Sequence, residues 1–235
     1  MTKNENIVFG AINRDCIQGL LFDVDGTLSD TDDQMVDSVN RTLQPVSLLF
    51  KNRDPRPFAQ WLVTAVETPA NFGYTIADRL NIDGALIRLH QKMTQRRKVK
   101  QTDQEQHRII PGVKAMLEKL SAKYPMAIVS SRDGHTICQF LEYFDLLPFF
   151  KVVVTSQTCQ HIKPSPDPIL FAAGQLGLDA QACLMIGDTI VDVRAGRSAG
   201  AQTVGVLCGF GTQRELKRAG ADLILSSTSD LAHIF

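Results

Sequence analysis

Two carboxylates stand two positions apart at the end of an apolar run, and they are the strongest chemical signal in the chain. Residues 20–27 read Leu-Leu-Phe-Asp-Val-Asp-Gly-Thr, so that Asp23 and Asp25 are followed directly by Gly26. Side chains at i and i+2 of an extended chain leave on the same side. Burial and mutual repulsion would perturb both acids. We therefore expect a cation beside them, because an unpaired buried charge is costly.

Polar side chains also follow three other short apolar runs, residues 126–129, 151–155 and 183–186. These side chains are Ser130, Ser131, Lys163, Asp188 and Asp192. Ligands of open α/β sheets collect at the carboxyl ends of the strands, so the groups are expected to meet there. Asp188 and Asp192 are four residues apart and would share one face of a helix if a helix begins at that point.

This set of groups suits chemistry on a phosphate. Carboxylates without a His or Cys cluster favour a hard cation such as Mg²⁺. Lys163 and the Ser130 hydroxyl would complement phosphate oxygens. Asp23 could attack phosphorus through an aspartyl-phosphate intermediate. Asp25 could then serve as general acid and base.

The elements that must position these groups alternate between strand and helix. The expected strands are residues 17–24, 126–129, 151–155, 183–186, 202–206 and 222–225, and the expected helices are residues 112–123, 136–144, 169–176 and 191–199. Strands separated by helices imply crossover connections. The sequence therefore predicts an α/β fold, a three-layer, doubly wound, Rossmann-like parallel sheet.

Residues 33–100 have a different character, because their apolar residues recur at helical spacing and prolines punctuate them. We expect an all-helical cap domain at residues 30–108. The α/β core domain is then discontinuous and consists of residues 1–29 and 109–235.

The overall composition argues against several classes of protein. Acidic and basic side chains balance at 25 each in 235 residues, so no global field favours nucleic acid or a membrane surface. No apolar run has the length of a membrane span, and the first residues lack the apolar stretch of a signal peptide. Five dispersed cysteines fit a reducing compartment. We expect a cytoplasmic protein without nucleic-acid or membrane partners, and the sequence leaves open whether it is a monomer or a weak dimer.

Four ordered motifs resemble those of the haloacid dehalogenase superfamily. They are Asp23-Val-Asp-Gly-Thr-Leu28, the strand end at Ser130, Lys163-Pro-Ser-Pro166 and Gly187-Asp-Thr-Ile-Val-Asp192. The resemblance covers roughly residues 17–206, and the insertion is placed like that superfamily's helical cap of the first type. In motif sequence the chain is similar to the phosphoglycolate phosphatases of the superfamily.

The resemblance implies a role for each motif residue. Asp23 is the nucleophile and Asp25 the acid and base. A small phosphorylated substrate is bound by Ser130, Ser131 and Lys163. Mg²⁺ is bound by Asp23, the Asp25 main-chain carbonyl and Asp188, and the supporting residues are Gly26, Thr27 and Asp192. Similar enzymes of the dehalogenase and phosphonatase branches lack the acid at position 25, so a phosphate substrate is favoured over a haloacid.

Other functions share these motifs. A sugar-phosphate mutase resembling β-phosphoglucomutase has the same core, and its cap decides whether the phosphoryl group meets water or a sugar hydroxyl. A non-catalytic binding protein of this fold would be supported by the loss of a motif residue, and every motif residue is present. A nucleic-acid 3′-phosphatase is disfavoured by the neutral net charge.

Several other residues carry weaker signals. A basic stripe at helical spacing consists of Arg88, Lys92, Arg96 and Lys100. It could attract an anionic leaving group, but a solvated helix face is the favoured interpretation. The aromatic residues Trp61, Phe72 and Tyr74 are interpreted as cap core rather than as a specificity pocket. Arg132 follows the serine pair and could touch the substrate, but an exposed arginine is the favoured interpretation.

Overall fold

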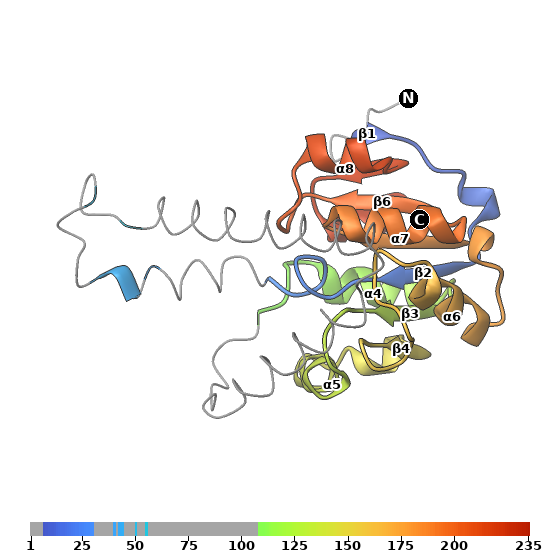
Figure 1. Ribbon diagram of the computed structural model, residues 1–235, viewed down its shortest axis with the longest axis horizontal. Helices are drawn as coiled ribbons and strands as arrows, with labels where there is room; N and C mark the ends of the chain where they lie inside the picture. Colours follow the sequence, from blue (N-terminus) through green and yellow to red (C-terminus); the bar gives the residue numbers. More distant parts are fainter. Residues whose placement is uncertain (1–6, 31–39, 41, 45–49, 51–54, 56–107) are drawn as a thin grey trace. The chain divides into compact units, whose positions relative to one another are not determined.

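The structure is a computed structural model, and it describes residues 7–30, 40, 42–44, 50, 55 and 108–235. A seven-stranded sheet runs through this part of the chain (Figure 1). The strands are β1 (Ile7–Gly10), β2 (Gly19–Phe22), β3 (Met126–Val129), β4 (Val152–Val154), β5 (Cys183–Gly187), β6 (Gln202–Val206) and β7 (Leu223–Leu225). Their order across the sheet is β1-β7-β6-β5-β2-β3-β4.

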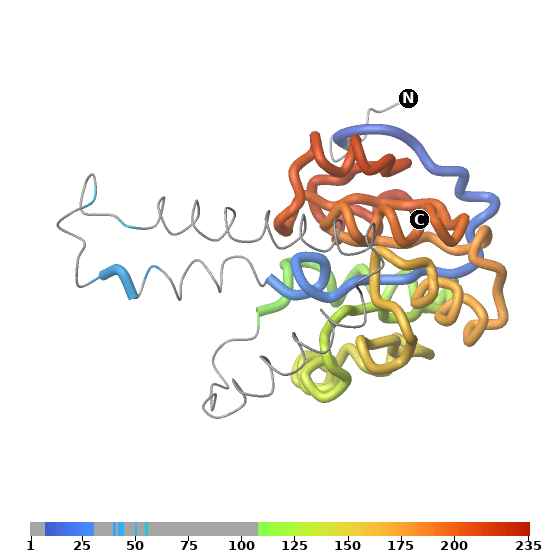
Figure 2. The backbone as a smooth tube through the Cα atoms, in the orientation of Figure 1, coloured from blue at the N-terminus to red at the C-terminus, as the bar shows by residue number. Residues whose placement is uncertain are grey.

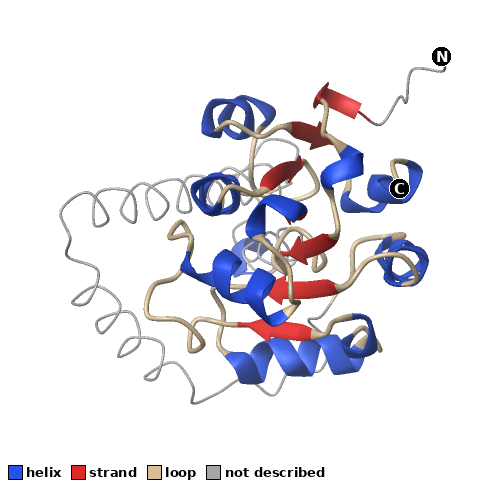
Figure 3. Cartoon of the chain, turned by 90° about the vertical axis from the view of Figure 1, so that its right-hand side faces the viewer, coloured by secondary structure: helices blue, strands red, loops and turns tan. Residues whose placement is uncertain are grey.

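Within the described residues, five helices connect these strands: α4 (Val113–Ser121), α5 (Gly134–Tyr143), α6 (Asp167–Gln175), α7 (Ile190–Ala199) and α8 (Gln213–Ala219). Short 3-10 helices lie at Arg14–Cys16, Leu147–Phe149, Ala180–Ala182 and Thr228–His233. Figure 3 shows helices on both sides of the strands. The predicted three-layer α/β fold is confirmed.

The layers follow from the alternation of side chains along each strand. In β2, Leu20 and Phe22 pack against one apolar cluster that includes Leu117 of α4 and Phe140 of α5. Leu21 leaves from the opposite face and packs against α6 and α7 in a second cluster. All four residues of β2 are buried, so the central strand is covered on both faces, as expected for a parallel sheet.

The sequence prediction missed strand β1 and helix α8, which both lie near the β1 edge of the sheet. Strand β1 pairs antiparallel with β7, so the sheet is mixed and not purely parallel. The tube in Figure 2 shows this blue N-terminal stretch beside the red C-terminal strand. Helix α8 buries a single side chain, Leu216, against the sheet. A four-residue edge strand and a seven-residue helix with one buried position offer too short a pattern to recognise.

Contacts divide the chain into two compact units, Met1–Thr31 with Arg108–Phe235, and Asp32–His107. The predicted cap domain at 30–108 lies almost wholly outside the described residues, together with the basic stripe and the three aromatic residues named with it. Its helical character therefore stays a prediction. Within the described residues, no helix combines the length and apolarity that a membrane span requires.

Candidate active site

The order of the sheet places three predicted site segments side by side. Strand β2 pairs in parallel with β5 on one side and with β3 on the other. Asp23 follows β2, Ser130 follows β3 and Asp188 follows β5, so all three lie at the same carboxyl edge. This is the edge where open α/β sheets bind ligands.

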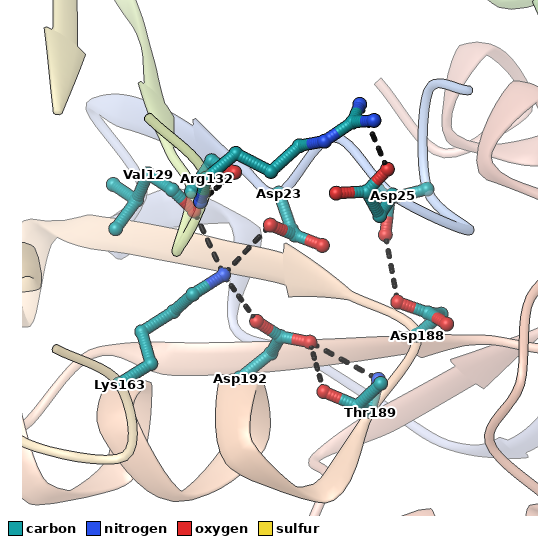
Figure 4. Close-up of polar contacts among 10 residues, drawn as sticks. Asp23, Asp25, Val129, Arg132, Lys163, Asp188, Thr189 and Asp192 are labelled. Carbon is teal, nitrogen blue, oxygen red and sulfur yellow. Dashed lines mark hydrogen bonds and ion pairs between the residues drawn. The ribbon is translucent and has the colours of Figure 1, made fainter. Parts of the chain in front are cut away.

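Lys163 is the centre of the site (Figure 4). Its Nζ donates to Asp23 Oδ1 at 2.7 Å, to Asp192 Oδ1 at 2.6 Å and to the Val129 carbonyl at 2.8 Å. The Lys163 side chain is 3% exposed, and the side chains of Asp23 and Asp192 are 9% and 1% exposed. The cation that the two acids of the opening octet require is thus supplied, in part, by a residue 140 positions further along the chain.

The electrostatics of this pair follow from burial and from neighbouring charges. Burial raises the pKa of Asp23 to about 7 from its ordinary 3.8, and Lys163 opposes the shift while Asp192 and Asp25 add to it. Burial tends to lower the pKa of Lys163, but the carboxylates of Asp192 and Asp23 outweigh it, and the net shift is upward. Lys163 is therefore a permanent cation, and the ionisation of Asp23 depends on further positive charge.

Asp192 is held at the start of α7. Its Oδ2 accepts the Thr189 N–H at 3.1 Å and the Thr189 hydroxyl at 2.5 Å, while Oδ1 accepts Lys163. Asp188 and Asp192 do not share a helix face, because α7 begins at Ile190 and Asp188 precedes it. The fold still brings both carboxylates close to Asp23.

Asp188 is fully buried and is oriented by two donors. The Phe210 N–H donates to Oδ2 at 2.9 Å, and the buried Thr27 hydroxyl lies 3.4 Å from Oδ1. Gly26 has φ of 67°, and a Cβ at this position would lie 2.3 Å from Asp188 Oδ2. Thr27 and Gly26 therefore support Asp188 rather than the substrate directly. Sequence reasoning missed Phe210 because a backbone N–H has no side-chain signature; the glycines on either side of it were the available clue.

Asp25 differs from Asp23 in exposure and in partner. Its side chain is 29% exposed, and its Oδ1 lies 3.1 Å from Arg132 Nη1. The interpretation of Arg132 as an ordinary exposed arginine is thus incomplete, since its side chain is 35% exposed and paired with a predicted catalytic acid. This contact joins segments that are far apart in the sequence and requires the pairing of β2 with β3.

The two serines after β3 have different environments. Ser130 is buried, and its Oγ accepts the Arg132 N–H at 3.2 Å, next to the Val129 carbonyl that binds Lys163. Ser131 is exposed, and the structure gives it no bond to the buried acids of the described region. Binding of phosphate by either hydroxyl stays a prediction.

The donor set fits a divalent cation. One carboxylate oxygen each from Asp23, Asp188 and Asp192 lies within 4.8 Å of the others, and all three residues are buried. Oδ1 of Asp192 already binds the Lys163 ammonium at 2.6 Å and Oδ2 accepts both Thr189 donors, whereas Oδ1 of Asp188 has a long contact of 3.4 Å with the neutral Thr27 hydroxyl. Oδ1 of Asp23 accepts a hydrogen bond from Lys163, whereas Oδ2 of Asp23 accepts no hydrogen bond from the described residues. Asp23 and Asp188 are therefore the better pair of ligands, and hard oxygen donors of this kind suit Mg²⁺.

Comparison with known proteins agrees with the geometry. Residues 20–206 match the sequence pattern of the haloacid dehalogenase-like hydrolases, which is most of the chain. The chain belongs to this family. It is 29% identical over 224 residues to pyrophosphatase PpaX of Bacillus velezensis, covering 93% of this chain and 96% of that protein. It is 25% identical over 232 residues to phosphoglycolate phosphatase of Escherichia coli O157:H7, covering 92% and 91%.

The fold of this family member is also found among solved structures. A hydrolase from Pseudomonas syringae superposes with a TM-score of 0.62 at 27% identity, covering 92% of this chain and 97% of that one. The resemblance drawn from the four motifs is confirmed at the level of the family. The roles of individual residues stay predictions.

Proposed function

We propose that this haloacid dehalogenase-like hydrolase is a Mg²⁺-dependent phosphatase that cleaves a small phosphorylated metabolite through an aspartyl-phosphate on Asp23. One observation carries the proposal: a buried ammonium, Lys163, bridges Asp23 and Asp192 at the carboxyl edge of the sheet, with Asp188 beside them. Buried carboxylates of this density, paired with one lysine, serve no evident structural need. The carboxylates would hold a divalent cation, and that cation together with Lys163 would complement the negative charge of a phosphoryl group.

In the first step, an Asp23 carboxylate oxygen attacks phosphorus, and the bond from phosphorus to the leaving oxygen breaks. Asp25 gives its proton to that oxygen as general acid. Its greater exposure places Asp25 toward the solvent side, where a leaving group enters and departs. The nearby charge of Lys163 offsets the negative charge on the non-bridging oxygens, and the Ser130 hydroxyl can donate a hydrogen bond to one of them.

In the second step, Asp25 takes a proton from water, and the water oxygen attacks the phosphorus of the aspartyl-phosphate. Inorganic phosphate leaves and the Asp23 carboxylate is restored. Lys163 holds Asp23 in place through both steps, because its other two donors fix it to Asp192 and to the Val129 carbonyl. Thr27 and the Phe210 N–H orient Asp188 in the same way.

Asp23 and Asp188 would hold the cation. When bound, Mg²⁺ supplies positive charge that favours the ionised nucleophile and neutralises the transferred phosphoryl group. The raised pKa of Asp23 supports this assignment, because Lys163 alone leaves the group about half protonated near neutral pH. We further propose that the insertion at 30–108 is a helical cap that selects the substrate.

The names of the relatives narrow the class of substrate. Pyrophosphatase PpaX and phosphoglycolate phosphatase both act on small phosphate compounds by their names. We propose a substrate of that size for this chain.

The test is release of inorganic phosphate from a panel of small phosphorylated compounds, with Mg²⁺ and with EDTA. We expect turnover that needs Mg²⁺ and that disappears in Asp23→Asn. The matched control is Asp145→Asn, because Asp145 is 84% exposed and has φ of 54°, a conformation that asparagine tolerates. This control variant is expected to retain activity.

Three results would contradict the proposal. Absence of turnover on the whole panel, including aryl phosphates, would favour a binding protein. Full activity of Asp23→Asn would exclude the mechanism. Interconversion of hexose phosphates without release of phosphate would favour the mutase.

A further inference from the structure

The candidate active site contains two cations within the described residues, and they have different surroundings. All three donors of the Lys163 ammonium are occupied, by Asp23, Asp192 and the Val129 carbonyl. Arg132 has five N–H donors, and within the described ranges its ion pair with Asp25 is the one polar contact of the guanidinium. Of the two cations, Arg132 is therefore the one that still has N–H donors available to bind a ligand.

The backbone of Arg132 is fixed, so its reach is defined. Its N–H donates to Ser130 Oγ at 3.2 Å, and its carbonyl accepts the Ser156 N–H at 3.0 Å. The next residue, Asp133, caps α5 by accepting the Thr136 N–H at 3.2 Å. In the view of Figure 4, the Arg132 side chain passes on one side of Asp23, while Lys163 and Asp192 lie on the other.

The position of the guanidinium relates it to the leaving group. In the proposed mechanism, Asp25 lies within hydrogen-bonding distance of the leaving oxygen, and Arg132 Nη1 is 3.1 Å from Asp25. The guanidinium is then within roughly 6 Å of the leaving oxygen. A charged group one or two bonds beyond that oxygen falls within its reach. A guanidinium binds carboxylates and phosphates with two parallel N–H donors.

We propose that Arg132 is a specificity residue that binds an anionic group of the leaving group. The preferred substrates are then phosphate esters or anhydrides in which a carboxylate or a second phosphoryl group lies beside the scissile bond. The inference rests on the proposed phosphatase function, and it assigns to the core domain a part of substrate selection that the sequence placed in the cap. In this assignment, the charge of Lys163 stabilises the transferred phosphoryl group, and Arg132 binds the leaving group.

The experiment compares substrates that differ in this one charge. Phosphoglycolate is paired with 2-hydroxyethyl phosphate, in which a neutral CH₂OH replaces the carboxylate. Pyrophosphate is paired with methyl phosphate, which lacks the second phosphoryl group. The first pair thus tests recognition of a carboxylate, and the second tests recognition of a phosphoryl group. The measured quantity is the ratio of kcat/KM within each pair, for the wild type, Arg132→Met and Arg132→Lys.

For the wild type we expect a ratio well above one in at least one pair. In Arg132→Met that ratio should fall about 10- to 100-fold, the effect of losing a charged hydrogen bond. Arg132→Lys keeps the charge without the fork and should recover part of the loss. General damage to Asp25 affects both members of the phosphoglycolate pair, which both release a primary alkoxide, and so largely cancels in that ratio; in the pyrophosphate pair it slows methyl phosphate more and would raise the ratio, the opposite of the expected fall. Arg214→Met is the matched control, because Arg214 is exposed on α8, and it should leave the ratio unchanged.

A second measurement does not require turnover. Binding of pyrophosphate and of phosphoglycolate to Asp23→Asn is measured by calorimetry, with and without Arg132→Met, and the second substitution should weaken one of them by a similar factor. An unchanged ratio and unchanged binding in a variant that still hydrolyses phosphate esters would overturn the role of Arg132 alone. If the wild type hydrolyses none of the four compounds, the proposed function fails and this inference fails with it.

Discussion

Replacing the proposed nucleophile should stabilise the metal-free protein. The raised pKa of Asp23, about 7 against 3.8, means that ionising this carboxylate costs more free energy in the folded state than in the unfolded state. The difference corresponds to at most about 4 kcal/mol above pH 7. The amide introduced by Asp23→Asn is a neutral group of the same shape and can still accept a hydrogen bond from Lys163. In EDTA at pH 8, we therefore expect Asp23→Asn to be more stable than the wild type by up to about 4 kcal/mol.

The sign of the pH dependence follows from the same shift. Asp23 is an acid whose folded pKa lies above its unfolded pKa, so between pH 3.8 and 7 the native state holds a proton that the unfolded state has lost. Stability of the wild type should therefore fall as pH rises through this range and level off above it. The advantage of Asp23→Asn should shrink to about 2 kcal/mol at pH 5.

Urea unfolding at pH 5 and pH 8, in EDTA and in Mg²⁺, measures these differences. A cation that binds the folded state stabilises it, so Mg²⁺ should raise the stability of the wild type at pH 8 more than that of Asp23→Asn. Asp145→Asn is the control and should show no such pH dependence. The reasoning is refuted if the wild type is as stable as Asp23→Asn in EDTA at pH 8, or if the difference is the same at both pH values.

Three further substitutions test the supports of the site. Lys163→Met leaves two buried carboxylates without their cation, and we expect a loss of about 3–5 kcal/mol in urea unfolding and of at least about 100-fold in kcat. Gly26→Ala places a Cβ against Asp188 at a positive φ, and it should cost at least about 2 kcal/mol and abolish Mg²⁺ binding in calorimetry. Thr189→Val removes the hydroxyl that donates to Asp192, and it should cost about 1 kcal/mol and lower kcat.

Each of these has a matched control. Lys151→Met removes an exposed lysine, and Gly174→Ala adds a methyl group where nothing lies within 4 Å. Thr212→Val removes the equivalent hydroxyl at the start of α8, which donates to Glu215 at 2.7 Å. The account of the supports is wrong if Lys163→Met or Gly26→Ala behaves like its control. It is also wrong if Thr189→Val and Thr212→Val lower kcat equally. Both substitutions remove a hydroxyl that caps a helix, but only the Thr189 hydroxyl donates to a carboxylate of the candidate site, that of Asp192.

The parts of the site that lie within one motif could be predicted from the sequence. Asp23 and Asp188 end central strands whose apolar runs are clear, and parallel pairing of adjacent strands brings their carboxyl ends together without further information. Thr189 and Asp192 lie within one motif as well, and their capping box sets the start of α7.

Contacts between motifs could not be predicted in the same way. The bridge from Lys163 to Asp192 depends on where the loop before α6 meets the start of α7, and the ion pair of Arg132 with Asp25 depends on the β2–β3 pairing. The Phe210 N–H is recognised by its position and not by its side chain. At the sheet edge, β1 is four residues long and pairs with a strand near the other end of the chain, so local periodicity carries no information about it.

The most direct test of the account is to trap the phosphorylated enzyme. The protein is mixed with substrate and Mg²⁺, quenched in acid within milliseconds, digested and analysed by mass spectrometry. We predict one added phosphoryl group on the peptide that contains Asp23, absent in Asp23→Asn and lost on brief treatment with base, as expected for an acyl phosphate. Steady release of phosphate with no phosphorylated peptide, or with the group on another residue, would contradict the assignment of Asp23 as the nucleophile.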